Sequence, residues 1–366
     1  MYTPMFVISN NLLKYIGRIE ACREVITNAP LVPAWEARFR EDAMVRSVHH
    51  GTHLEGNEIT KEQTERIVRL EVERHEDAGK IAQEAGIYAK HRDVQEVINY
   101  RDVLSWIDSH AVGVEGRDAY TEETLQELHS IVTSHLLDDA SIGHYRKQQV
   151  VVRSVDTGEI VFRPPVSLDV PFLIQEFFIW LNSKDARELH PVIRAGIVHY
   201  ELVRIHPFVE GNGRTARAMA MLVMYSEGYD VKRFFSLEEY FDKDIQEYYR
   251  AILSVQQHPK QEMTYWLEYF SYGLAVELDR IREQVLKLSQ DIKLKNKLGT
   301  QIALSERQII LLELLHQQGQ IATTEANEAL PMVSTDTILR DLKDLIEKGI
   351  IKKQGVTKGV IYKLNE

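Results

Sequence analysis

The chain has 366 residues, a formal net charge of −11, 44% hydrophobic residues and one cysteine, Cys22. This length allows two to three domains with a substantial core, and the charge excludes a nucleic-acid-binding protein with an overall basic surface. A single cysteine excludes a framework of disulfides and indicates a reducing compartment. The first residues lack the basic and apolar parts of a signal peptide, and no run approaches ~20 apolar residues, so we expect a cytoplasmic protein without a membrane partner.

The N-terminal region, residues 1–115, is predicted to be helical and charged, and 69–91 within it is predicted to be a solvated helical surface. The segment 43–54 also has helical spacing, and it is followed by Glu55 and Gly56, a glycine typical of a helix end. A carboxylate at a helix C-terminus opposes the helix dipole, and a neighbouring cation would cancel that misfit. By itself, however, Leu-Glu-Gly-Asn is an ordinary helix stop.

The segment 149–162 has the pattern of a β-hairpin: a β-branched run, an Asp-Thr-Gly turn at 156–158 and a second apolar run that ends before two prolines. An isolated hairpin is marginally stable, so we expect it to pack on the helices, with His144, Tyr145 and Arg146 anchoring its base. Its free edge could accept a segment of a target protein by strand addition. The alternative is that it only caps the bundle.

The apolar spacing predicts a helix over 190–205 that ends near His206, because the proline that follows disfavours the α conformation of its predecessor. Gly211 and Gly213 permit positive φ and a close approach of backbone N–H groups to an anion. Asn212, between them, is predicted to cap the next helix. Taken separately, such a turn commonly just joins two helices, and a histidine at a helix end is commonly structural.

Arg214 and Arg217 then place two cations, three residues apart, near the first turn of a strongly helix-forming segment. They oppose the helix dipole there, so a bound polyanion explains them better than turn chemistry does. Glu210 would repel that anion unless a divalent cation bridged the two, and Mg²⁺ is commonly held by one carboxylate plus phosphates. Neutral His206 could accept a proton from an attacking hydroxyl. The string therefore predicts a nucleotide phosphate site.

A helix is predicted over 240–253, where Tyr248 and Tyr249 are adjacent. Neighbouring helical residues point about 100° apart, so only one of the two can face a pocket. Either tyrosine could border a ligand or belong to the core. A further helix over 272–294 leads to a predicted linker at 295–299.

The tail is predicted to contain three helices, over 305–319, 323–330 and 334–348, followed by a hairpin over 350–364. Three helices and a hairpin resemble a winged helix, a module whose third helix often enters the major groove of DNA. The acids on that helix are Asp336, Asp341 and Asp344, and the bases on the wing are Lys352, Lys353 and Lys358. Because charges in the tail nearly balance, dimerisation or target docking is favoured over DNA binding.

The pattern His-x-Phe-x-Asp/Glu-Gly-Asn-Gly-Arg-x-x-Arg, matched at every specified position by 206–217, resembles the signature of Fic-domain proteins. The resemblance implies a mostly helical fold that transfers AMP from Mg·ATP to a protein hydroxyl and releases pyrophosphate. It implies that His206 is the general base and Glu210 the Mg²⁺ ligand. The anion cradle that it implies is made of Gly211, Asn212 and Gly213, and the β- and γ-phosphates are held by Arg214 and Arg217. The related Doc branch usually has Lys in place of Gly213.

The resemblance also implies that an N-terminal helix inserts Glu55 against Arg217 and prevents productive seating of the γ-phosphate. The family usually has Ser or Thr where this chain has Gly51, although Thr52 follows directly. By the same resemblance the hairpin is a flap that positions the target hydroxyl, and the helix that carries Tyr248 and Tyr249 borders the adenosine.

We therefore expect a mainly α chain: 1–115 with the inhibitory helix at about 43–57, a Fic core over 116–272, a connecting helix and linker over 273–297, and a winged-helix-like α+β domain over 298–366. The predicted function is a protein adenylyltransferase, autoinhibited by Glu55, that modifies a Ser, Thr or Tyr hydroxyl of a target protein or of itself. A homodimer fits these expectations. Two alternatives remain: a hydrolase that removes AMP with Glu55 activating water, and an ATP-sensing DNA-binding regulator.

Overall fold

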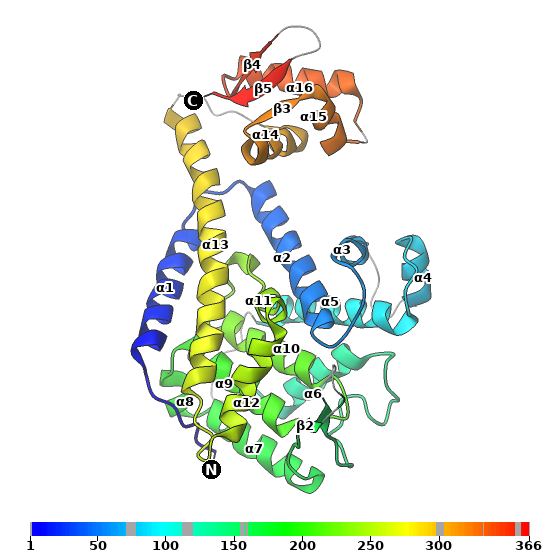
Figure 1. Ribbon diagram of the computed structural model, residues 1–366, viewed down its shortest axis with the longest axis vertical. Helices are drawn as coiled ribbons and strands as arrows, with labels where there is room; N and C mark the ends of the chain where they lie inside the picture. The colour runs from blue at the N-terminus through cyan, green and yellow to red at the C-terminus, as the bar shows by residue number, and fades with distance from the viewer. Residues whose placement is uncertain are drawn as a thin grey trace. The chain divides into compact units, whose positions relative to one another are not determined.

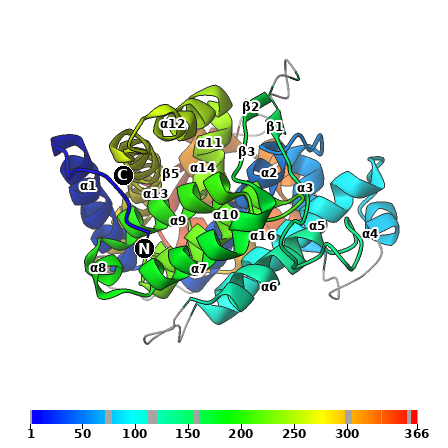
Figure 2. The same ribbon diagram turned by 90° about the horizontal axis from the view of Figure 1, so that it is seen from below.

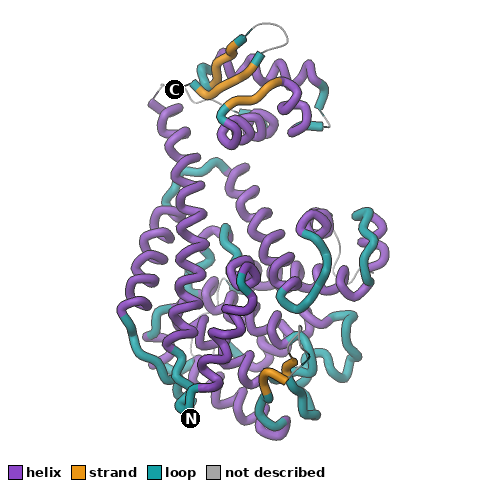
Figure 3. Tube along the Cα trace, viewed as in Figure 1, coloured by secondary structure: helices purple, strands orange, loops and turns teal. Residues whose placement is uncertain are grey.

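The computed structural model describes residues 2–70, 78–111, 120–153, 158, 160–297, 304–331, 333–355 and 360–365 (Figure 1). The chain forms two compact units, one made of Met1–Ala29 and Trp35–Val285 and the other of Pro30–Ala34 and Leu286–Glu366. In the first unit the described residues are almost all helical or in loops (Figure 3). None of the described helices is both long enough and apolar enough to cross a membrane.

The N-terminal part of the first unit is helical, as predicted. Its helices are α1 (Asn10–Thr27), α2 (Pro33–His53), α3 (Lys61–Arg69), α4 (Ala78–Glu84) and α5 (His91–His110). The helix predicted over 43–54 is the second half of α2. The solvated helical surface predicted over 69–91 is only partly right: among its described residues Arg69, Ala78–Glu84 and His91 are helical, whereas Leu70 is extended and Gly86 takes a positive φ after α4. Residues 71–77 of that prediction lie outside the described part.

The rest of the first unit surrounds one central helix. Its longer helices are α6 (Glu122–Thr133), α7 (Val170–Leu181), α9 (Pro191–Ile205), α10 (Asn212–Ser226), α12 (Ile245–Gln257) and α13 (Thr264–Lys297), the last of which belongs to the second unit from Leu286 onward. Helices α8 (Lys184–Glu188) and α11 (Leu237–Lys243) are short. Helix α10 packs against α9, α5 and α6 (Figure 2). Nearly every residue of α10 is buried, because small and flexible side chains alternate along it and let its neighbours approach closely.

Two predicted boundaries in this part differ from the structure. The single helix predicted over 240–253 is wrong: Asp244 leaves the helical region and its side chain accepts a hydrogen bond from the backbone N–H of Glu247, which ends α11 and caps α12. Helix α13 contains the predicted 272–294 segment and begins earlier, at Thr264.

The predicted hairpin is present as two short antiparallel strands, β1 (Val152–Arg153) and β2 (Ile160–Phe162). Most of its predicted turn, Asp156 and Thr157, lies outside the described residues. Arg146 anchors its base, as predicted: the buried guanidinium donates from Nη2 to the carbonyl of Pro165 at 2.6 Å and from Nε to the carbonyl of His206 at 2.8 Å. The base of the hairpin is therefore tied to the end of α9.

The second unit has the three helices and the hairpin that the sequence predicts. Its elements are α14 (Glu306–Gln318), β3 (Gln320–Ala322), α15 (Thr323–Ala329), α16 (Thr335–Glu347), β4 (Ile351–Gln354) and β5 (Ile361–Leu364). The prediction missed β3, which adds a third antiparallel strand in the order β3-β5-β4. Leucines and isoleucines of α14 and α16 form its core together with Ala326 of α15 and residues of the strands. The wing residue Lys358 and the linker residues 298–299 lie outside the described part.

Candidate functional site

His206 stands at the exit of α9. Its backbone takes a left-handed conformation with φ of 52°, and its N–H closes the helix on the carbonyl of Leu202 at 2.9 Å. The imidazole Nδ1 lies 3.2 Å from the carbonyl of Val203, an acceptor, so Nδ1 carries the proton and Nε2 is left with a lone pair. Burial lowers the pKa of His206 below its usual value. The ring is therefore neutral near pH 7 and can accept a proton at Nε2.

The loop after His206 is closed by the side chain of Asn212. Its Nδ2 donates to the carbonyl of Phe208 and its Oδ1 accepts from the N–H of Phe208, both at 2.9 Å. Asn212 is the first residue of α10, and Gly211, with φ of 74°, takes the capping position. The prediction that Asn212 caps this helix is therefore wrong, because its amide is used across the loop. The first N–H groups of α10 make no side-chain capping bond.

A buried histidine on α6, His129, packs against this loop and hydrogen-bonds to it. Its Nε2 lies 3.0 Å from the carbonyl of Glu210, and its Nδ1 accepts from the backbone N–H of Gly143 at 2.9 Å. The ring stacks on Phe208 with centroids 3.7 Å apart. Since Nδ1 accepts, the neutral ring carries its proton on Nε2 and donates it to Glu210. Sequence reasoning missed this residue, because nothing in the local pattern around His129 points to a loop far along the chain.

Both arginines of the motif are buried, and several of their N–H groups make no hydrogen bond among the described residues. Arg214 and Arg217 are 2% and 5% exposed. The N–H groups without a partner are Nε and Nη1 of Arg214 and Nε of Arg217. Buried guanidinium donors without acceptors are costly, and phosphate oxygens are the acceptors that fit them best. The pair is suited to a polyphosphate.

Glu55 contacts the second of these arginines. Its Oε1 accepts from Arg217 Nη2 at 2.8 Å, which is the pairing that the two misplaced charges of the sequence predicted. Burial raises the pKa of Glu55, but Arg217 and Arg214 outweigh it and leave the pKa below its usual value. A Cβ on Gly213 would collide with Glu55 Oε1. The carboxylate thus lies directly on the backbone of the loop, at the start of α10.

The segment after Glu55 is fixed to α5. Asn57, which is buried, donates from Nδ2 to the carbonyl of Asp93 and to Glu96 Oε2, both at 2.9 Å. Glu96 also receives Arg214 Nη2 at 3.4 Å. Sequence reasoning did not single out Asn57 or Glu96. One signal was available, because Asn57 immediately follows the Glu-Gly pair.

Glu210 is the one carboxylate that the motif loop itself carries. It forms an ion pair with Arg92, from the first turn of α5, and its Oε1 lies 3.7 Å from Arg214 Nη2. Among the described residues no group of three or more His, Cys, Asp or Glu side chains could hold a metal ion. A divalent cation here would therefore need ligands from a bound molecule in addition to Glu210. Arg92 was not predicted, although a cation in the first turn of a helix is the same signal that marked Arg214.

The adjacent tyrosines of α12 lie beside the Glu55–Arg217 pair. Tyr248 is buried and its hydroxyl lies 3.1 Å from Nε2 of His199, which is buried as well. Tyr249 is 39% exposed, and its hydroxyl donates to the carbonyl of Leu54 at 3.4 Å. As predicted for neighbours on a helix, one packs inward and the other reaches the surface.

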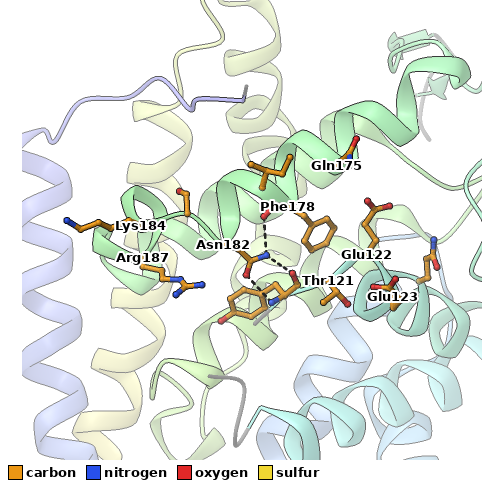
Figure 4. A pocket seen from close by; sticks show the side chains of 12 residues that line it. Thr121, Glu122, Glu123, Gln175, Phe178, Asn182, Lys184 and Arg187 are labelled. Atoms are coloured by element: carbon orange, nitrogen blue, oxygen red, sulfur yellow. Dashed lines mark hydrogen bonds between the residues drawn. The ribbon is translucent and has the colours of Figure 1, made fainter. Parts of the chain in front are cut away.

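An open groove lies elsewhere on the first unit, between the start of α6 and the end of α7 with α8 (Figure 4). The amide of Asn182 crosses its floor and donates to the carbonyls of Tyr120 at 2.6 Å and Phe178 at 3.1 Å. None of the motif residues lines this groove. It is separate from the candidate site.

Comparison with known proteins agrees with this geometry. Residues 119–224 match the Fic/DOC family. The chain belongs to the Fic/DOC family. Residues 307–355 match the DeoR-like helix-turn-helix domain, so the tail of this Fic protein is a helix-turn-helix region that contains a short antiparallel sheet.

The curated relatives of this Fic protein are named protein adenylyltransferase Fic. The protein from Culex quinquefasciatus is 30% identical over 216 residues, which are 59% of this chain and 39% of that protein. The protein from Drosophila mojavensis is 33% identical over 193 residues, or 52% of this chain and 34% of that protein. The chain thus spans well under half the length of these relatives.

Solved structures confirm the fold. A Fic family protein from Desulfovibrio desulfuricans G20 has a TM-score of 0.66 at 19% identity, covering 99% of this chain and 98% of that one. Fic-1 from C. elegans has a TM-score of 0.57 at 21% identity, covering 76% of this chain and 73% of that one. The predicted fold class, mainly α with a hairpin and a small α+β tail, is confirmed.

Proposed function

We propose that this Fic protein transfers AMP from ATP to the hydroxyl of a Ser, Thr or Tyr side chain, in a target protein or in itself. The hydroxyl oxygen attacks the α-phosphorus, pyrophosphate leaves, and the proton of the hydroxyl passes to His206 Nε2. One observation carries the proposal: the imidazole keeps a lone pair at Nε2 beside a loop whose two arginines have buried N–H groups without acceptors.

The residues present fit Mg²⁺ held mainly by the nucleotide. Glu210 supplies one carboxylate at the mouth of the loop, at a distance from Arg214 that lets both face the same phosphates. When bound, Mg²⁺ would offset the charge of the phosphates and of the departing pyrophosphate. Arg92 now pairs with Glu210 and would have to release it. Gly211, Asn212 and Gly213 would offer backbone N–H groups, and Arg214 and Arg217 would bind the β- and γ-phosphates.

We also propose that Glu55 inhibits this reaction. Its carboxylate occupies Arg217 and lies against the backbone of Gly213, so a γ-phosphate seated there would meet a like charge. Asn57 fastens the same segment to α5 through two hydrogen bonds. Release of the segment that carries Glu55 would expose the Arg217 guanidinium and the adjacent backbone of Gly213 at the same time.

Transfer is tested with ATP labelled on the α- or the γ-phosphate, using full-length Glu55→Gly protein and Mg²⁺. Label from the α-phosphate, but not from the γ-phosphate, should enter the protein, and the intact mass should rise by one AMP. Glu55→Gly combined with His206→Ala is the matched control and should stay unlabelled. Incorporation of the γ-label, or no label at all with bound ATP, would reject nucleotidyl transfer.

Duplex DNA binding by the tail is a second candidate, favoured by the pairing of two acids on α16. Asp341 is buried against Arg307, with Oδ2 and Nε 2.7 Å apart, and Asp344 pairs with Lys348. Arg340 and Lys343 are exposed on α16, and Lys343 pairs with Glu347 at 3.7 Å. The outer face of the presumed reading helix is therefore less acidic than the sequence suggests. DNA binding would be supported if the full chain retarded duplex DNA, if the retardation decreased with salt, and if the Arg340→Ala, Lys343→Ala double variant lost it. No retardation at low salt would reject DNA binding.

A further inference from the structure

Helix α2, which precedes Glu55, has a glycine at position 51, and the ring of Tyr100 from α5 occupies the space that a side chain would take there. A Cβ on Gly51 would come within 3.0 Å of Cδ1 and Cζ of Tyr100 and closer still to Cε1. The hydroxyl of Thr52, one residue on, donates back to the carbonyls of its own helix at 2.9 and 3.0 Å. Helix α2 therefore offers Arg217 no hydroxyl; it offers the carbonyl of Gly51, at 2.8 Å, and the carboxylate of Glu55.

Two phenols have the Arg217 guanidinium as a neighbour, that of Tyr248 on α12 and, next to Gly51, that of Tyr100 on α5. The Tyr100 phenol is fully buried, donates to Glu238 Oε1 at 2.9 Å and has the Arg217 guanidinium as a charged neighbour. Burial raises the pKa of Tyr100 well above its usual value, and Glu238 raises it further while Arg217 opposes them. The phenol thus stays protonated and links a carboxylate to a guanidinium.

Glu238 is a buried carboxylate with hydroxyl partners. At 1% exposed, it accepts from Tyr100, from Ser47 at 3.1 Å and from Ser236 at 3.4 Å, and the described part of the chain shows no ion pair of Glu238. A buried charge needs compensation, and Arg217 is a cation that neighbours the same phenol. Glu238 and Arg217 also line the same small internal cavity. A carboxylate and a guanidinium thus share one cavity and have the same phenol as a neighbour.

We propose that Tyr100, fixed by Glu238, is a positioning residue for Arg217, which it holds in place for the nucleotide after Glu55 has left. If the α2 segment moves away, the carbonyl of Gly51 and the carboxylate of Glu55 leave with it. Tyr100 belongs to α5 and Glu238 to α11, so both side chains stay in place when the α2 segment moves. Release of the segment would then make the Arg217 guanidinium available to phosphate, while its side chain keeps its conformation. This inference rests on the proposed function, because it assigns Arg217 to the distal phosphates of ATP.

The test compares ATP with AMP in a background of Glu55→Gly and His206→Ala, in which Arg217 is uncovered and the nucleotide is not consumed. Tyr100→Phe keeps the ring against Gly51 and removes only the hydroxyl. Calorimetry should show ATP affinity about tenfold weaker, the usual scale for a lost hydrogen bond to a charged group, and AMP affinity unchanged. The control is Tyr200→Phe, because Tyr200 is also fully buried and its hydroxyl has no hydrogen-bond partner among the described residues. It should leave both affinities as they were.

Two further variants keep the inference open to contradiction. Glu238→Gln retains one acceptor oxygen. It should therefore weaken ATP binding less than Tyr100→Phe does, and it should leave AMP binding unchanged. Gly51→Ser should lower Tm in the wild type, yet much less when Tyr100 is replaced by Ala, because the two side chains compete for one space.

The outcomes separate the two claims. The positioning role would be overturned if Tyr100→Phe weakened the binding of ATP and of AMP equally, or weakened neither. If the ATP-specific loss is seen but the Glu55→Gly protein with His206 intact transfers no AMP, this inference stands and the proposed function is rejected. Failure of the Glu55→Gly background to bind ATP at all would contradict both.

Discussion

His129 donates from Nε2 to the carbonyl of Glu210 at 3.0 Å, and this bond ties the loop of the motif to α6. The bond requires a neutral ring whose Nδ1 accepts from Gly143 at the same time. A protonated ring could not accept, so the loop and its support depend on one protonation state. The arrangement predicts how the protein responds to acid.

We expect the free energy of unfolding to fall as the pH drops below about 6.5. Burial lowers the pKa of His129 to about 3, whereas an unfolded histidine titrates near pH ~6.5. Between those values only the unfolded chain binds the proton, so this contribution is complete above pH ~6.5 and is lost towards pH ~3, by up to about 1.4 kcal/mol per pH unit. Urea unfolding at a series of pH values measures it. His129→Gln, which can make both hydrogen bonds, should show a shallower dependence; an equal slope would show that His129 does not contribute.

His206→Ala should abolish AMP transfer and leave ATP binding nearly intact. The ring acts on the attacking hydroxyl and not on the nucleotide, and loss of a general base typically costs about 10²–10⁴ in rate. Single-turnover label transfer and calorimetry with ATP measure the two effects. A normal turnover would remove His206 from its role, and a parallel loss of binding would assign it to the nucleotide instead.

Glu210→Ala should raise the Mg²⁺ concentration needed for half-maximal transfer at least about tenfold, because the variant has no carboxylate on the loop to hold the ion. Arg92→Ala is the opposite variant: it removes the cation now paired with Glu210, so the Mg²⁺ requirement should fall. Titration with Mg²⁺ at saturating ATP measures both. An unchanged requirement in Glu210→Ala would place the ion elsewhere.

Asp242→Asn should raise the basal activity of the wild type. Asp242 on α11 accepts from His50 and from His53, each at 2.7 Å, and so holds the end of α2 just before Glu55. Asparagine has a single acceptor oxygen, so one of these bonds is lost and the inhibitory segment is released more often. The same substitution in a Glu55→Gly background should change nothing. A further rise there would mean that Asp242 acts on some other step.

The sequence was sufficient for the parts of the site that are close along the chain. The helix exit, the glycine turn and the two arginines lie within twelve positions, and the arginines conflict with the dipole of the helix that they begin. A second conflict, at Glu55, indicated a cation as its partner, and the resemblance to the family pointed to Arg217. The same rule could have singled out Arg92.

The parts that could not be predicted depend on contacts between distant segments. Gly51 was visible as a departure from the family pattern, but only the folded chain shows the ring of Tyr100 in its place. Asp244 looked like one more polar residue within a helix, whereas its side chain caps α12. His129 and Glu238 lie in ordinary amphipathic patterns, and their roles come from the groups that the fold brings to them.

The central claim is that Glu55 and the γ-phosphate compete for Arg217, and the rate of auto-modification in Glu55→Gly measures it most directly. We expect at least a tenfold rise over the wild type, which needs only about 1.4 kcal/mol of released competition. Glu55→Gln, which keeps the size and removes the charge, should give a smaller rise, and Arg217→Ala added to Glu55→Gly should reverse the gain. Equal or lower labelling in Glu55→Gly than in the wild type would contradict the account.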